Sequence, residues 1–234
     1  MLVLGIETST QQTSVALGTE RGAVATMSLA AERAGHELVA PAIQQLLAWS
    51  GASLDRVAGV AVGLGPGLFT GMRVGIATAK TLAQVLRVPI VGMASLDILA
   101  FDARYARRLV CAAIDAKRGE VFFAFYRPVP GGVARESGFE VASPQHVAGE
   151  LESRAEDILV VGTAALTYRH ELQEAGSKVE LASAERSYPA ASALVQLAVP
   201  RFQREEFDRP SDVQSYYVRK SDAEIAWDQR RRAG

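Results

Sequence analysis

Gly63-Leu-Gly-Pro-Gly-Leu-Phe-Thr-Gly-Met-Arg-Val-Gly75 is the most informative stretch of this sequence. The apolar run at 57–64 predicts a buried strand, residues 65–67 predict a tight turn, and residues 70–86 predict a helix. The free N–H groups of a helix N-terminus can bind an anion, and glycines let the backbone approach it closely. A strand-to-helix turn with a glycine-rich packing face is the alternative. The loop fits neither the Walker A pattern nor GxGxxG.

The two halves of the chain repeat the same order of elements. Each half opens with an apolar strand that ends in a carboxylate, at Ile6-Glu7 and at Ile114-Asp115. Each then continues with two more strands, a helix, a strand, a helix and a strand. Three consecutive strands followed by strand–helix crossovers predict a mixed sheet. The repetition therefore predicts an α/β protein with two similar lobes and a cleft between them.

A charged stretch at residues 102–108 separates two apolar blocks and predicts the boundary between the lobes. The first lobe is then expected at residues 1–104, with the helices that could mediate dimerisation. The second, at residues 105–234, is expected to be smaller. Its third strand is predicted near 139–141, and its last long helix near 190–204, before a tail.

Composition limits the class of protein. The chain has 234 residues, of which 49% are hydrophobic, and a net charge of −1. This balance excludes a basic field over the whole chain, and Arg230 to Arg232 are expected to lie in a solvated tail. The single cysteine, Cys111, is expected to be buried and inert. The sequence shows neither a signal peptide nor a membrane span, so we expect a cytoplasmic protein.

Polar residues at the ends of the opening strands are the candidates for a nucleotide site. In the sequence Glu7-Thr8-Ser9, a carboxylate followed by hydroxyls could hold a metal–phosphate, but an ordinary polar turn is the alternative. The candidates for cofactor binding are only weak, and we expect no resident cofactor. They are Glu7, Thr8, Ser9, Gly65, Gly67, Thr70 and Asp115.

The histidines do not predict a metal or catalytic site. His36-Glu37 and His170-Glu171 both begin like the zinc-protease motif HExxH, but Ala40 and Glu174 stand where the second histidine is needed. No set of nucleophile and base has any support in the sequence. We therefore expect no catalytic residues and no metal ligands.

The helices predicted at 36–50 and 70–86 have more apolar surface than one sheet can cover. Their apolar residues span roughly 200° of the helix circumference, against about 100° for a single core-facing stripe. Packing of the two helices on each other would explain the excess, and so would a partner. The second explanation predicts a partner interface of Leu38, Ala42, Leu46, Gly71, Gly75, Ala79, Ala83 and Leu86. The glycine and alanine residues recur at steps of four, which would let a partner helix approach closely.

Several motifs together resemble the TsaB (YeaZ) family over nearly the whole chain. The most specific is the block at 65–75. The others are Leu-Gly-Ile-Glu-Thr-Ser at 4–9, His-Glu-Leu-Val-Ala-Pro at 36–41, Ala-Ser-Leu-Asp at 94–97, Ile-Asp-Ala-Lys-Arg-Gly-Glu-Val at 114–121 and Tyr-Tyr-Val-Arg at 216–219. The family pattern often has Ser where this chain has Leu68.

The resemblance implies an actin-like ATPase (ASKHA, ribonuclease H-like) fold with a reduced second lobe and no independent catalysis. Proteins of this family pair with TsaD, the transferase that adds a threonylcarbamoyl group to the adenosine next to the anticodon of tRNAs reading codons that start with A. Such complexes also recruit the ATPase TsaE. The resemblance implies contact with tRNA only through the complex, and the free protein could be a homodimer. TsaD carries two metal-binding histidines on the helix that corresponds to 36–50, where this chain offers His36 and then Ala40.

Two enzymatic alternatives are weighed against this prediction. One is an ATP-dependent small-molecule phosphotransferase of the same superfamily, with Glu7 and Asp115 in the cleft. The turn after Asp115, however, lacks the hydroxyl cluster that follows Glu7. The other is a peptidase, which would need a metal pair or a nucleophile and a base.

Overall fold

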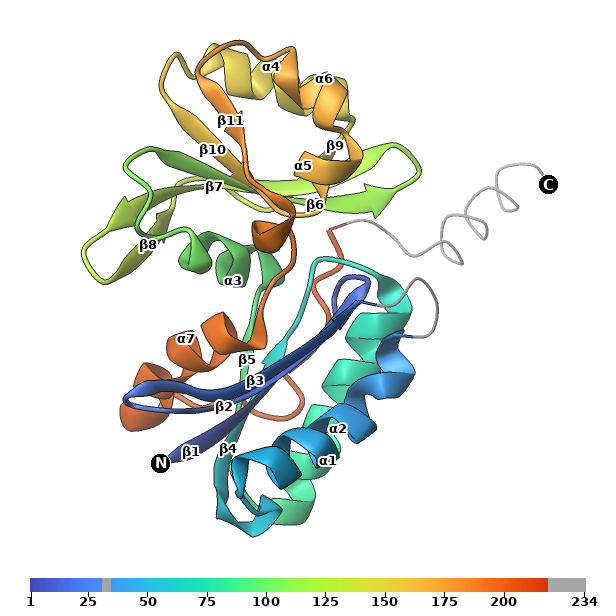
Figure 1. Cartoon of the computed structure of the whole chain (residues 1–234), viewed down its shortest axis with the longest axis vertical. Helices are drawn as coiled ribbons and strands as arrows, with labels where there is room; N and C mark the ends of the chain where they lie inside the picture. The colour runs from blue at the N-terminus through green and yellow to red at the C-terminus, as the bar shows by residue number, and fades with distance from the viewer. Residues whose placement is uncertain (31–34, 219–234) are drawn as a thin grey trace, which may run out of the picture.

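The computed structural model describes residues 1–30 and 35–218, which form two lobes with one mixed sheet each (Figure 1). The two mixed sheets confirm the predicted α/β class. The predicted tail with Arg230 to Arg232 lies outside the described residues. Within them, every helix is too short or too polar to cross a membrane.

The first sheet has five strands in the order β3-β2-β1-β4-β5. Its central strand β1 pairs antiparallel with β2 and parallel with β4. The side chains of Val3, Leu4 and Ile6 are fully buried, which agrees with the continuous apolar run of the sequence. The strands are β1 Leu2–Glu7, β2 Gln12–Thr19, β3 Gly22–Ala30, β4 Val57–Gly63 and β5 Ile90–Met93.

The second sheet repeats this arrangement as β8-β7-β6-β10-β11, with β9 paired to β7. The prediction of a third strand near 139–141 was incomplete. That stretch forms the short β9, whereas β8 holds the equivalent place and follows a tight turn at Gly131, whose φ is 84°. The strands are β6 Leu109–Lys117, β7 Glu120–Val129, β8 Gly132–Arg135, β9 Glu140–Ala142, β10 Ile158–Val161 and β11 Val179–Leu181.

Helices cover both faces of the first sheet (Figure 1). α1 (Val39–Ser50) and α2 (Phe69–Leu86) lie side by side on one face and run in the same direction. Their inner residues share one core with the strands, as Ile43 and Ile76 do with Val60. Short 3-10 turns precede α1 at Gly35–Leu38 (η1) and β4 at Leu54–Arg56 (η2).

The last helix shows that the predicted division into 1–104 and 105–234 was wrong. α7 (Ala191–Gln203) packs on the other face of the first sheet, where Val195 and Phe202 are buried. Glycines on the strands make room for it. A Cβ atom on Gly5 or Gly18 would lie 2.7 or 2.6 Å from Val195, and one on Gly59 would lie 2.7 Å from Phe202. The first lobe thus combines both ends of the described chain, and the second lobe is the central part from β6 to β11.

The remaining helices belong to the junction and to the second lobe. α3 (Ser95–Asp102) lies between the sheets, with Phe101 in the core around α7 and Leu99 in the core of the second sheet. α4 (Pro144–Ser153), α5 (Ala164–Thr167) and α6 (Arg169–Gln173) pack on the second sheet. α5 and α6 are separated at Tyr168, whose φ and ψ of −116° and 37° are not helical. The turn η3 (Ala184–Arg186) leads back toward α7.

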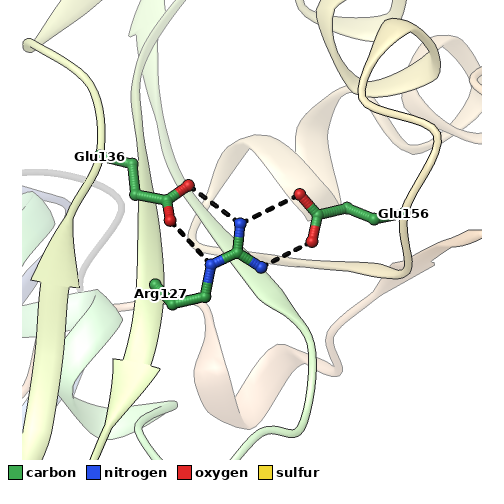
Figure 2. Close-up of polar contacts among 3 residues, drawn as sticks. All are labelled: Arg127, Glu136 and Glu156. Atoms are coloured by element: carbon green, nitrogen blue, oxygen red, sulfur yellow. Dashed lines mark hydrogen bonds and ion pairs between the residues drawn. The ribbon is translucent and has the colours of Figure 1, made fainter.

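One arginine ties two loops of the second lobe together (Figure 2). Arg127 on β7 donates to both carboxylate oxygens of Glu136 and to both of Glu156, at 2.6–3.1 Å. These hydrogen bonds lower the pKa of Glu156. The guanidinium thereby holds the segment after β8 against the loop before β10.

Candidate functional site

The first candidate, Glu7, is fully buried and bonded to the protein itself. Its Oε1 accepts the Ser9 N–H at 2.6 Å, and its Oε2 accepts the Ser95 hydroxyl at 2.9 Å. Ser95 Oγ in turn accepts the Gly65 N–H at 3.1 Å. A Cβ atom on Gly63 would lie 1.8 Å from Glu7 Oε2, so the neighbouring strand has room only for glycine there. Glu7 therefore joins β1, the glycine loop and the start of α3.

The glycine loop packs against the residues that follow β1. The Leu68 N–H donates to Ser9 O at 2.6 Å, and the Thr8 hydroxyl donates to Gly71 O at 2.7 Å. A Cβ atom on Gly67 would lie 2.1 Å from Ser9 O, and one on Gly71 would lie 2.1 Å from Thr8 O. The space that an anion would need beside these glycines is therefore filled by the chain's own backbone, and the structure favours the packing alternative. Thr70 is exposed in the first turn of α2.

Asp115, the candidate from the second lobe, is held by its own lobe. Its carboxylate accepts the Lys117 N–H and forms an ion pair with Lys117 Nζ, both at 2.8 Å. It also accepts the Tyr168 hydroxyl at 3.0 Å, while its N–H donates to Thr163 Oγ1 at 2.9 Å. Burial and the neighbouring Asp115 raise the pKa of Tyr168, which keeps that hydroxyl a donor.

The two lobes meet at a small cavity in this region. Thr10 and Leu68 from the first lobe face Asp115 and Tyr188 across it. Its volume is about 50 Å³, whereas pockets for drug-sized ligands measure roughly 300–1,000 Å³. Of the predicted candidates, only Asp115 lines this cavity, which has space for little more than water.

Sequence patterns missed the residues that hold these candidates in place. Neither Ser95 nor Lys117 was among the predicted candidates. Tyr168 and Thr163 approach Asp115 from 48 or more positions away along the chain. No local motif can indicate such contacts.

The described side chains show no metal-binding group, since no three of their His, Cys, Asp and Glu residues cluster. The His36 side chain lies outside the described part. His170 is exposed, and its Nδ1 lies 3.5 Å from a carboxylate oxygen of the exposed Glu174. Cys111 is fully buried as predicted, and burial raises the pKa of its thiol to about 12.

The predicted partner residues on α1 and α2 need correction. Most of them face the chain's own core, because the glycine and alanine row of α2 packs against β1 and the segment after it. Leu38 and Leu86 are half-buried. The buried residues, which a partner helix cannot reach, are Ala42, Leu46, Gly71, Gly75, Ala79 and Ala83.

Two large apolar side chains on the same helices are open to solvent. Val85 near the end of α2 is 72% exposed, and Trp49 near the end of α1 is 76% exposed. Because the helices run in the same direction, these residues lie at the same end of the pair (Figure 1). The other apolar residues of this face are half-buried and also pack against the core of the first lobe. The outer α1–α2 face comprises Leu47, Trp49, Val74, Leu82, Val85 and Leu86.

Comparison with known proteins gives consistent results. Residues 27–227 match the family model described as TsaD, tRNA N6-adenosine threonylcarbamoyltransferase. The chain is 30% identical over 230 residues to the tRNA threonylcarbamoyladenosine biosynthesis protein TsaB of Escherichia coli (strain K12), covering 97% of each protein.

Solved structures agree with this match. YeaZ from Pseudomonas aeruginosa aligns with a TM-score of 0.79 and 29% identity, over 92% of this chain and 99% of that one. Component A of the (R)-2-hydroxyglutaryl-CoA dehydratase from Acidaminococcus fermentans aligns with a TM-score of 0.51 and 12% identity, over 86% of this chain and 98% of that one. The latter similarity shows the actin-like ATPase fold alone.

Replacement of Glu7 by Gln should leave the protein folded, because the amide keeps the shape and one acceptor. Burial raises the pKa of Glu7 above its ordinary value of 4.5. A carboxyl that binds its proton more tightly in the folded chain loses stabilising effect as pH rises above the unfolded value. The stability of Glu7→Gln relative to the wild type should therefore increase as pH rises above about 4.5.

Thermal unfolding across this pH range measures the effect. Glu7→Ala is the matched variant, since it leaves the Ser9 N–H and the Ser95 hydroxyl without their acceptor. We expect it to lose roughly 1–3 kcal/mol for each orphaned donor. Equal stability of the Gln and Ala variants, or a constant difference between Gln and wild type, would contradict this assignment.

Proposed function

Because the chain belongs to the TsaB (YeaZ) family, we propose that it acts in the cytoplasm as a non-catalytic partner subunit in tRNA threonylcarbamoyladenosine formation. In this proposal it binds TsaD, which transfers the threonylcarbamoyl group to the adenosine next to the anticodon. TsaE, an ATPase, joins the complex. The tRNA is bound by the assembly rather than by an active site of this chain.

The observation that carries the non-catalytic role is the state of the cleft. Both carboxylate oxygens of Glu7 accept hydrogen bonds from within the protein, and Asp115 forms an ion pair with Lys117. A phosphotransferase needs a carboxylate free to accept a proton from its substrate and space for a nucleotide. Neither carboxylate is free in this sense, and the cavity of about 50 Å³ is too small for a nucleotide.

The outer α1–α2 face supports the binding of TsaD. Exposed apolar side chains that lie together on one surface favour association with another protein. A paralogous subunit with helices of the same origin could pack against this face as a four-helix contact. The same face would serve a homodimer of the free chain, in competition with TsaD.

The variant Val85→Glu tests this interface. The buried carboxylate would have no partner, so we expect affinity for TsaD to fall by more than tenfold, equivalent to about 1.4 kcal/mol. Threonylcarbamoyl transfer in a reconstituted assay with TsaD, TsaE, a threonylcarbamoyl donor and unmodified tRNA should fall in parallel. Gln84→Glu places the same charge one residue away, on the polar side of α2, and should behave like the wild type.

Circular dichroism must show that both variants fold. If folded Val85→Glu binds TsaD with wild-type affinity and supports full transfer, the interface lies elsewhere. If transfer by TsaD and TsaE proceeds equally well without the chain, the proposed function itself is wrong.

Titration with ATP separates this function from that of a phosphotransferase. The filled glycine loop and the small cavity predict a dissociation constant weaker than about 10 μM for the isolated chain, or no measurable heat. Isothermal calorimetry in the presence of magnesium is the measurement. Tight, magnesium-dependent binding that is lost in Asp115→Asn would favour the enzymatic alternative.

A further inference from the structure

A second cavity lies between the end of α3 and the edge of the second sheet, apart from the cleft and from the outer α1–α2 face. Its volume is about 610 Å³, which is within the range of ligand sites. The side chains of Ala103, Ala106, Leu159 and Leu181 give it apolar walls. Arg186 on η3 donates to the backbone carbonyl of Asp102 at 3.1 Å, so the two segments that border the cavity are in contact.

Arginines gather around this cavity. Arg169 and Arg186 line it, and three more lie on the adjoining turn between α3 and β6. Arg108 lies within ion-pair distance of a carboxylate of the described chain, that of Glu180 at 2.5 Å, and no other of these arginines does. Arg104 donates to Phe101 O at 2.9 Å and to Gln196 Oε1 at 3.3 Å, so its guanidinium is already partly bonded. The group comprises Arg104, Arg107, Arg108, Arg169 and Arg186.

The carboxylates nearby are fewer than the arginines. Residues 102–108, 169 and 180–186 contain five arginines against three acidic residues, Asp102, Glu180 and Glu185. This excess of positive charge stands out in a chain whose net charge is −1. Guanidinium groups without carboxylate partners are suited to phosphate, which they bind through paired N–H donors.

An aromatic ring stands at the same place. Tyr105 lines the cavity and is 82% exposed. The guanidinium carbon of Arg104 lies 4.5 Å from the centre of its ring. A solvent-exposed ring beside arginines is the combination that stacks an unpaired base while the cations contact the backbone.

We propose that this cavity is an RNA-binding site for an unpaired stretch of the tRNA substrate. A nucleobase stacks on Tyr105 against the apolar wall, and Arg169 and Arg186 contact the flanking phosphates. That the RNA is a tRNA rests on the proposed function. That the ligand is an unpaired nucleic acid strand is inferred from the arginines and the tyrosine at the cavity. The site extends the RNA surface of the assembly onto this subunit.

RNA binding is measured by fluorescence anisotropy with the full chain and a labelled, unmodified tRNA transcript. If about three phosphates are contacted, the affinity should fall by about 20-fold when the salt concentration rises fourfold, from about 50 to about 200 mM. The double variant Arg169→Glu/Arg186→Glu should bind at least tenfold more weakly and with a smaller salt dependence. The control Arg21→Glu/Arg56→Glu makes the same change of charge at exposed positions of the first lobe and should stay within about twofold of the wild type.

Tyr105→Ala should weaken binding about fivefold or more without changing the salt dependence, because it removes stacking rather than charge. All substituted side chains are exposed, and melting curves check that each variant folds. The proposal is overturned if the wild type does not bind RNA at low salt or if the cavity variants bind like the control. It is also overturned if duplex DNA binds as tightly as tRNA, or if polyglutamate competes as well as single-stranded RNA does.

The outcomes separate this proposal from the proposed function. If the chain supports transfer by TsaD while its cavity variants bind RNA like the wild type, only the RNA site is wrong. If the chain is dispensable for transfer but its RNA binding is lost in the cavity variants, the RNA site is supported and the proposed partner function is wrong.

Discussion

The carboxylate of Glu7 has no access to water, and the first lobe is built around satisfying it. An ionised carboxylate in a protein interior is costly unless donors surround it, and here the Ser9 N–H and the Ser95 hydroxyl supply them. These two bonds fix the end of β1 against the start of α3, and through Gly65 they position the glycine loop. Gly63 must lack a side chain for the carboxylate to fit. The arrangement of the lobe around the end of β1 therefore depends on the contacts of this one carboxylate.

This use of Glu7 is consistent with the proposed role of an ATPase-like fold as a binding subunit. Once Thr8 and Ser9 occupy the space along the glycine loop, α2 packs closely on the sheet and its glycine and alanine row is buried. The outer α1–α2 face is then left toward solvent, with Val85 of α2 and Trp49 of α1 exposed. The close packing of α2 on the sheet thus has two consequences. It fills the space beside the glycine loop, and it fixes the orientation of the outer α1–α2 face.

The sequence allowed the repeated order of strands to be predicted, because periodicity and strand-end carboxylates are local signals. Of the candidate residues, Asp115 lines the cavity between the lobes, whereas Glu7 and the glycine loop contact each other within the first lobe. The sequence did not allow the prediction of features that depend on contacts between residues far apart in the chain. The side of α2 that faces the core depends on the contact between Thr8 and Gly71, and the place of α7 depends on glycines of strands far away in the chain. A helical wheel shows how wide an apolar arc is, but not which part the chain itself covers.

The central claim is that this subunit works by presenting α1 and α2 to TsaD. Hydrogen–deuterium exchange of the chain, measured with and without TsaD, tests it directly. We predict slower exchange in the C-terminal halves of α1 and α2, around Trp49 and Val85, and unchanged exchange in α4 to α6 of the second lobe. Protection confined to the second lobe, with α1 and α2 unaffected by TsaD, would contradict the account.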